Sequence, residues 1–302
     1  NEFYSSIISL FLGIILAFFL NIKINFKLSP GKVQKSFIYF FLISSISFLT
    51  QKILSKFIFN NFDYEITRIV ISGICFIFFY FIHIKISFKD VKQAGVAIYA
   101  NGVEDIAKIY NKIQSYPDFI QVDIVDKSFY PNALNVQSYR LETIKAYWPN
   151  KKIHIHIMSK EPKKWIQETL PYADKIFFHY EMKNKVKEIL DDFNNDLEKF
   201  GLAVSVNTEF QEYEKYIKLF KNFLVVSIPQ PGFSGQKFSD KTYKIVQKIK
   251  NYQGSTVKKL CIDGGINENT IKNLDADEIV SGSYVLEANN PIQNILKLQF
   301  NL

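Results

Sequence analysis

Short apolar runs alternate with charged, amphipathic stretches over the last two thirds of the chain, and this alternation limits the fold more than any other feature. Alternation of this kind is typical of βα units around a parallel sheet. Eight runs have the length and the β-branched or aromatic residues of strands: 95–99, 119–125, 152–157, 175–178, 202–206, 224–228, 259–262 and 278–280. Helical stretches lie between them, such as 103–115, 162–170 and 183–200. Eight units between residues 91 and 302 predict a small (β/α)₈ barrel.

Two of these runs lead into a carboxylate. QVDIVDKSFYPN, residues 121–132, carries Asp123 between apolar neighbours, and CIDGGIN, residues 261–267, carries Asp263 before Gly264 and Gly265. In a parallel barrel both carboxylates would lie at the rim where barrel enzymes hold their active sites. Paired glycines expose backbone N–H groups, as a phosphate site requires.

The first ninety residues have a different composition. Three segments, 5–26, 36–59 and 67–88, contain no acidic residue and are long enough to cross a bilayer. A buried helix hairpin of a water-soluble protein is the alternative, but its helices rarely lack acidic residues over such lengths. We therefore expect a multi-domain chain, with an α-helical transmembrane bundle at 1–90 followed by an α/β barrel at 91–302.

Charge distribution predicts the topology of this bundle. The second connection carries Asp63 and Glu65, whereas lysines crowd the first connection and the end of the third segment: Lys23, Lys27, Lys32, Lys35, Lys85, Lys89 and Lys92. Cytoplasmic loops are rich in lysine, so we expect a multi-pass protein of the inner (cytoplasmic) membrane with its barrel in the cytoplasm. The chain then starts outside and begins with Asn1, which predicts an additional upstream helix.

Charge and cysteine content exclude other classes. A net charge of +8 and a pI near 9.1 are compatible with a nucleic-acid partner, but the basic, aromatic-interleaved motifs of such proteins do not occur in the sequence. We expect no nucleic-acid partner. Only Cys75 and Cys261 occur, which excludes a disulfide framework and a CxxC metal site.

Residues 1–90 contain a short internal sequence repeat. FFLNIKINFK, residues 18–27, recurs as FFYFIHIKISFK, residues 78–89. A duplicated two-helix unit explains the repeat, and so does the general habit of ending spans with aromatic residues and lysines. This part resembles the GtrA-type family of small four-helix membrane proteins. The resemblance implies a role in moving or handling polyprenyl-phosphate-linked sugars during surface polysaccharide assembly.

The second part resembles ribulose-phosphate 3-epimerase and its relatives. Six motifs occur in family order: QVDIVDKSFYPN, IHIHIMSKEPKKW, DKIFFHYE, SIPQPGFSGQKF, CIDGGIN and DEIVSGSYVL. The resemblance implies a TIM barrel of the ribulose-phosphate-binding type. It also implies an isomerase that removes a proton beside the ketone of a phosphorylated ketose and returns it to the opposite face.

The same resemblance implies roles for individual residues. Asp123 and Asp263 match the two catalytic aspartates, and both match metal ligands together with His156. Two carboxylates suit proton transfer on two faces of a flat ene-diolate, and a divalent metal (Zn, Fe, Mn or Co) suits its oxyanion. The alternative for an aspartate at a strand end is a helix cap or a loop salt bridge.

Several positions depart from the family pattern. Gln121 stands where the family has another metal-binding histidine, and an amide oxygen is a poorer ligand for zinc or iron. His154 lies on the same strand face as His156, either as a replacement ligand or as a hydrogen-bonded core histidine. Further departures are Ala97 for a serine, Lys127 for a glycine and Ser227 for a methionine.

The resemblance also indicates where phosphate binds. The matching residues follow the last three strands: Gly235, Gly264, Gly265, Gly282 and Ser283. Tight turns are the alternative explanation for these residues. Pro231, Gly232, Ser234 and Gly235 predict a lid over the substrate. Met158 matches a substrate contact, whereas His179 and Glu181 match family residues that serve in packing or in contacts.

Together these patterns predict a membrane-anchored ketopentose-phosphate 3-epimerase-like enzyme. It would be coupled to a GtrA-type module that translocates a polyprenyl-phosphate sugar, so its partners would be a phosphorylated ketose and a membrane lipid or lipid-linked sugar. Two alternatives remain open: a non-catalytic sugar-phosphate-binding barrel that regulates a lipid-linked sugar flippase, and a flippase for which the barrel is a scaffold. Homo-oligomerisation is also open.

Overall fold

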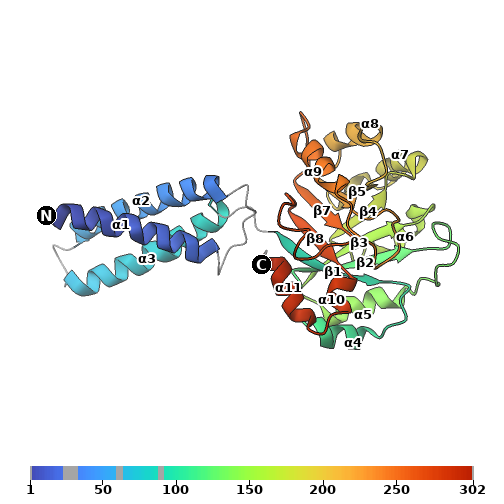
Figure 1. Ribbon diagram of the computed structural model, residues 1–302, viewed down its shortest axis with the longest axis horizontal. Coiled ribbons are helices and arrows are strands. Elements are labelled where there is room, and N and C mark those ends of the chain that lie inside the picture. Colours follow the sequence, from blue (N-terminus) through green and yellow to red (C-terminus); the bar gives the residue numbers. More distant parts are fainter. Residues whose placement is uncertain (1, 23–32, 59–63, 88–91, 301–302) are drawn as a thin grey trace. The chain divides into compact units, whose positions relative to one another are not determined.

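The computed structural model describes residues 2–22, 33–58, 64–87 and 92–300. The chain separates into two compact units, Asn1–Val91 and Lys92–Leu302 (Figure 1). Each unit has its own buried apolar core. The second unit holds the candidate active site.

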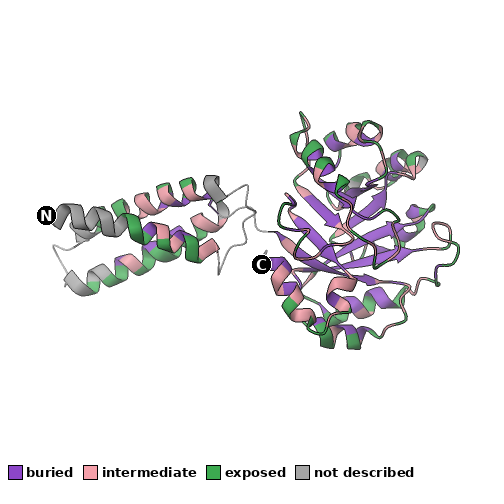
Figure 2. Ribbon diagram, viewed as in Figure 1, coloured by how far each residue is buried: buried purple, intermediate pink, exposed green. Residues whose placement is uncertain are grey.

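Eight parallel strands close into a barrel in the second unit, in the order β1 to β8. The strands are β1 (Gln93–Tyr99), β2 (Phe119–Val125), β3 (Lys152–Met158), β4 (Lys175–His179), β5 (Phe200–Ser205), β6 (Asn222–Val226), β7 (Lys259–Asp263) and β8 (Glu278–Ser281). They are buried almost throughout (Figure 2). The predicted (β/α)₈ barrel is confirmed.

Helices follow the strands. They are α4 (Ile106–Ile113), α5 (Tyr139–Tyr147), α6 (Pro162–Thr169), α7 (Lys183–Asp192), α8 (Phe210–Tyr213), α9 (Lys241–Asn251), α10 (Ser283–Leu286) and α11 (Pro291–Phe300). One helix was predicted over 183–200, but the observed helix α7 ends at Asp192, and β5 already begins at Phe200. The strands predicted at 202–206 and 224–228 each begin two residues earlier. Asn222 fits a buried strand because its amide donates to the carbonyl oxygens of Glu198 and Phe200.

Strand register decides which side chains enter the barrel. Gln121 of β2 pairs with His154 of β3, and Asp123 pairs with His156. Their sequence neighbours, such as Val122 and Ile155, are fully buried in the large core outside the barrel wall. Because side chains alternate along a strand, the polar set faces the barrel interior.

The first unit contains α1 (Glu2–Leu20), α2 (Val33–Ile58) and α3 (Tyr64–Lys85). Small buried clusters join the helices, and large apolar side chains such as Leu12, Leu42 and Ile74 are exposed. Within the part of the chain that the structure describes, one helix is long and apolar enough to cross a membrane, Ser36–Leu54, beside shorter apolar stretches Phe11–Leu20 and Ile69–Ile84. Most lysines and acidic residues used for the topology prediction lie at 23–32, 59–63 and 88–91, outside the described residues.

Candidate active site

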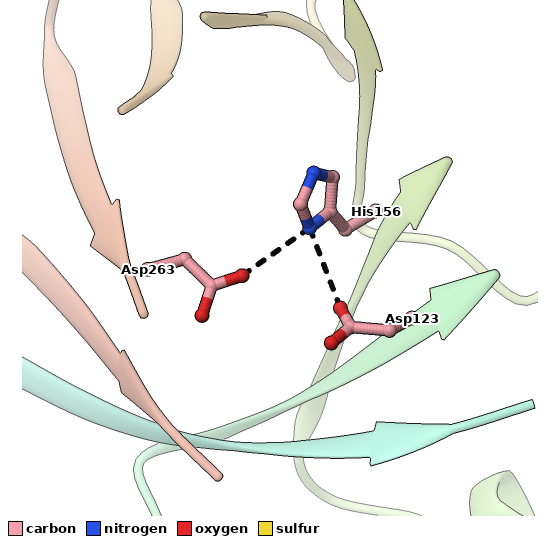
Figure 3. Close-up of side chains that lie close together, drawn as sticks. All are labelled: Asp123, His156 and Asp263. Atoms are coloured by element: carbon pink, nitrogen blue, oxygen red, sulfur yellow. Dashed lines mark ion pairs between the residues drawn. The ribbon is translucent and has the colours of Figure 1, made fainter. Parts of the chain in front are cut away.

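Three side chains from three strands converge inside the barrel (Figure 3). Nδ1 of His156 lies 3.4 Å from Oδ1 of Asp123 and 3.2 Å from Oδ2 of Asp263. One ligand atom from each residue lies within 4.8 Å of the others. Asp123 and His156 are buried, and Asp263 is partly exposed. The structure thus brings together the three residues that the motifs indicated.

Gln121 completes this group. Its Nε2 donates to Oδ1 of Asp123 at 2.9 Å and to Oδ2 of Asp263 at 2.8 Å. Its Oε1 is buried and has no hydrogen-bond partner among the described residues. Gln121, two residues before Asp123 on β2, therefore links the two carboxylates through its amide N–H groups.

Burial and mutual repulsion control protonation here. Burial and the neighbouring Asp263 raise the pKa of Asp123, although His156 and Gln121 act in the opposite direction. Burial alone would lower the pKa of His156, but the two carboxylates beside it prevail and raise that pKa to about 9. The protonation states of Asp123, Asp263 and His156 therefore depend on one another.

His156 is held from behind by a second histidine and a glutamate. Its Nε2 lies 3.0 Å from Nε2 of His179, whose Nδ1 lies 2.8 Å from Oε2 of Glu181. Burial lowers the pKa of His179, so this ring is neutral at pH 7. A neutral His179 that donates Nδ1–H to Glu181 must accept at Nε2. His156 then donates its Nε2–H and turns Nδ1 toward the aspartates.

Glu181 is itself firmly bound. Its Oε1 accepts from the backbone N–H of Ser205 at 2.9 Å and from the hydroxyl of Thr208. Burial would raise the pKa of Glu181, but the hydrogen bond and electrostatic influence of His179, with the hydrogen bonds from Thr208 and Ser205, lower it to about 2. The sequence motif DKIFFHYE indicated His179 and Glu181, whereas nothing in the sequence indicated Ser205 or Thr208.

His154 lies away from this group. Its ring stacks on Phe119, with centroids 4.1 Å apart, and its Nδ1 lies 3.9 Å from Oε2 of Glu278. Both ring nitrogens are buried without a hydrogen-bond partner in the described part of the chain. Of the two roles considered for His154, the structure favours a core histidine, although not a hydrogen-bonded one.

A cavity of about 360 Å³ opens beside the aspartates and His156. The residues expected to bind phosphate or substrate all line it: Met158, Gly235, Gly264, Gly265, Gly282 and Ser283. Gly264 and Gly265 have φ values of +104° and +64°, a region that favours glycine. A Cβ on Gly265 would lie 2.5 Å from the backbone nitrogen of Phe238. Close packing therefore keeps this turn free of side chains.

The loop after β6 covers part of the cavity. Gly232, Phe233, Ser234, Gly235 and Gln236 all line it. The Gln236 amide ties the loop together, because it donates to the carbonyl oxygens of Gln230 and Phe233 and accepts from the N–H of Gln230. This internal bonding suits a loop that moves as one piece.

Tyr99, which the sequence reasoning missed, also lines the cavity. Burial raises the pKa of its hydroxyl, and Asp123 and Asp263 raise it further, while a hydrogen bond with Ser234 acts in the opposite direction. Tyr99 lies two residues beyond Ala97 on the same face of β1. The Tyr99 side chain thus places a hydroxyl group on the cavity wall near Ala97, which stands where the family has a serine.

Parallel barrels frequently bind phosphate at the loops after their last strands, and facing carboxylates beside such loops suit acid–base catalysis; this chain is an enzyme barrel of that class. The model of the ribulose-phosphate 3 epimerase family matches residues 95–286. The chain belongs to this family, which places it among the epimerases of the isomerase class.

Individual relatives agree with the family assignment. Ribulose-phosphate 3-epimerase from Helicobacter pylori is 28% identical over 182 residues, covering 58% of this chain and 82% of the relative. The enzyme of the same name from Chlamydia trachomatis is 27% identical over 200 residues, covering 62% and 83%.

Solved structures show the fold alone. The structure of 3-hexulose-6-phosphate synthase from Salmonella typhimurium superposes with a TM-score of 0.54 at 14% identity, covering 70% of this chain and 98% of that one. Mycobacterium tuberculosis tryptophan synthase superposes with a TM-score of 0.53 at 9% identity, covering 70% and 93%.

Proposed function

We propose that the barrel interconverts the C3 epimers of a phosphorylated ketopentose, with ribulose 5-phosphate as the first candidate. The observation that carries the proposal is the pair Asp123 and Asp263, which face one another beneath the glycine-rich turns. They come from β2 and β7, which are not neighbours in the barrel. Two carboxylates that reach a substrate from different sides can serve its two faces. The relatives named as ribulose-phosphate 3-epimerases support this choice of substrate.

The chain's own groups divide the work. Backbone N–H groups at Gly264, Gly265, Gly282 and Ser283 hold the phosphate and fix the distance from it to C3. One aspartate removes the C3 proton and the other delivers a proton to the opposite face, which inverts the centre. The loop after β6 excludes water while the ene-diolate exists.

The donor set fits a divalent cation. Nδ1 of His156 is buried without a good hydrogen-bond partner among the described residues, and it faces two carboxylate oxygens. Asp123, His156 and Asp263 would hold the cation, and Gln121 would be the fourth ligand. A bound divalent cation supplies positive charge for the ene-diolate oxygens. The set of oxygen and nitrogen donors is compatible with Mn, Fe, Co or Zn.

We further propose that residues 1–90 form a GtrA-like membrane unit and that residues 91–302 lie in the cytoplasm. The apolar helix Ser36–Leu54, the exposed apolar side chains and the lysine-rich connections support an inner-membrane, multi-pass protein. The repeated FFLNIKINFK-type segment supports a duplicated helix pair. In this proposal the unit handles a polyprenyl-phosphate sugar for a surface glycan.

Epimerase activity of the purified full chain tests the central part of this proposal. We expect conversion of ribulose 5-phosphate to xylulose 5-phosphate in the presence of a divalent metal, and at least a ~1000-fold loss in Asp263→Asn. Asp275→Asn is the matched control, because Asp275 pairs with Lys250 away from the cavity. Binding of ribulose 5-phosphate without turnover would instead support a sugar-phosphate sensor.

A further inference from the structure

The Gln121 side chain presents the wrong end of its amide for a metal ligand. Its N–H groups, 2.9 and 2.8 Å from Asp123 and Asp263, point at the same two oxygens that Nδ1 of His156 approaches. Its Oε1 has no partner among the described residues, and the residue is completely buried. The donor end is thus fully used, and the acceptor end is unused.

An amide has two ends of nearly the same shape and opposite hydrogen-bonding character. With N–H toward the aspartates, the amide stabilises two negative groups when no cation lies between them. With oxygen toward them it would add a third acceptor, which is unfavourable without a cation and favourable around one. A half turn of the amide exchanges the two arrangements without moving the strand.

We infer that Gln121 is a reversible ligand: it holds the carboxylates through N–H when the site lacks metal, and turns its Oε1 to a divalent cation on binding. The inference rests on the proposed function, since it requires that the aspartates and His156 bind a cation. Three oxygens and one imidazole nitrogen form a harder donor set than one with two imidazoles. Carboxylate and carbonyl oxygens suit Mn²⁺, whereas imidazole suits Zn²⁺. Gln121 therefore biases the site toward Mn²⁺.

Metal titrations of the metal-stripped full chain test this inference. Calorimetry with Mn²⁺ and with Zn²⁺ would compare wild type, Gln121→His, Gln121→Met and Gln299→Met. Gln299→Met is the matched control, because Gln299 is also a buried glutamine and donates to the Tyr116 carbonyl far from the cavity. Tryptophan fluorescence confirms that each variant is folded.

We expect Gln121→Met to weaken Mn²⁺ binding about tenfold. We expect Gln121→His to tighten Zn²⁺ about tenfold while it changes Mn²⁺ less than about threefold. Gln299→Met should leave both affinities unchanged. Wild-type Mn²⁺ affinity in Gln121→Met, or an unchanged Zn²⁺/Mn²⁺ ratio in Gln121→His, would overturn the role of Gln121 and leave the metal site standing. Absence of binding in all four proteins would overturn the metal site and this inference with it.

Discussion

Replacing Glu181 with glutamine should destabilise the barrel and make its stability less dependent on acid pH. Hydrogen bonds and the electrostatic influence of His179 lower the pKa of Glu181 from 4.5 to about 2, which corresponds to about 3 kcal/mol at about 1.4 kcal/mol per pH unit. A neutral His179 contributes less than this electrostatic part, and glutamine keeps one acceptor oxygen. We therefore expect a loss of about 2 kcal/mol in the free energy of unfolding at pH 7.

The direction of the pH dependence follows from the lowered pKa. A carboxylate with a depressed pKa stabilises the folded state fully above its unfolded pKa of 4.5, and this contribution is lost as the pH falls toward 2. Glutamine does not titrate. The difference between wild type and Glu181→Gln should thus be constant from pH 7 to 5.5 and smaller by about 1.4 kcal/mol at pH 3.5.

Urea unfolding followed by tryptophan fluorescence measures this difference. The two tryptophans of the chain, Trp148 and Trp165, both lie in the barrel unit, so the signal reports on that unit alone. Glu198→Gln is the control, because Glu198 is also a paired carboxylate, with Lys221 as its partner, but is 75% exposed. A difference below about 0.5 kcal/mol at pH 7, or one that is equal at pH 7 and 3.5, would refute the reasoning.

Three further outcomes are expected. Glu181→Gln should weaken Mn²⁺ binding by about tenfold in calorimetry, because a loosened His179 no longer orients His156. An unchanged Mn²⁺ affinity would show that the His179–Glu181 pair does not position the metal ligand. Gly265→Ala should raise the KM for ribulose 5-phosphate at least ~10-fold, because the added Cβ would clash with the Phe238 backbone. Gly254→Ala is the control and should leave the KM unchanged, because Gly254 also has a positive φ but no close backbone contact. Equal KM values for the two variants would contradict phosphate binding at the Gly264–Gly265 turn. Single cysteines at positions 29 and 61, in a background lacking Cys75 and Cys261, should react oppositely with an impermeant thiol reagent in intact cells, and labelling of position 29 from outside would reverse the topology.

The sequence predicted the barrel because strand burial and strand length are local properties. Runs of Ile, Val and Phe that alternate with charged stretches leave few other arrangements, and motif order placed Asp123, His156 and Asp263 at one end. The start of β5 was missed because Phe200 and Gly201 follow a helical stretch without an obvious stop signal.

Contacts between residues far apart in the chain could not be predicted from the sequence. The contact of Glu181 with Thr208 joins residues 27 positions apart on loops after two different strands. The orientation of the Gln121 amide depends on which charges surround it in three dimensions, and the chain gives no local sign of that. Tyr99 is only the last residue of a predicted strand in the sequence, and the closed barrel turns it toward the cavity.

Deuterium incorporation into ribulose 5-phosphate tests the central claim most directly. The metal-loaded full chain would be incubated with the substrate in D₂O, and NMR would locate the label. Proton transfer between Asp123, Asp263 and the substrate predicts one deuterium at C3 of both ribulose 5-phosphate and xylulose 5-phosphate. Label at C1 would indicate an aldose–ketose isomerase, and absence of label with every metal tested would contradict acid–base catalysis by these aspartates.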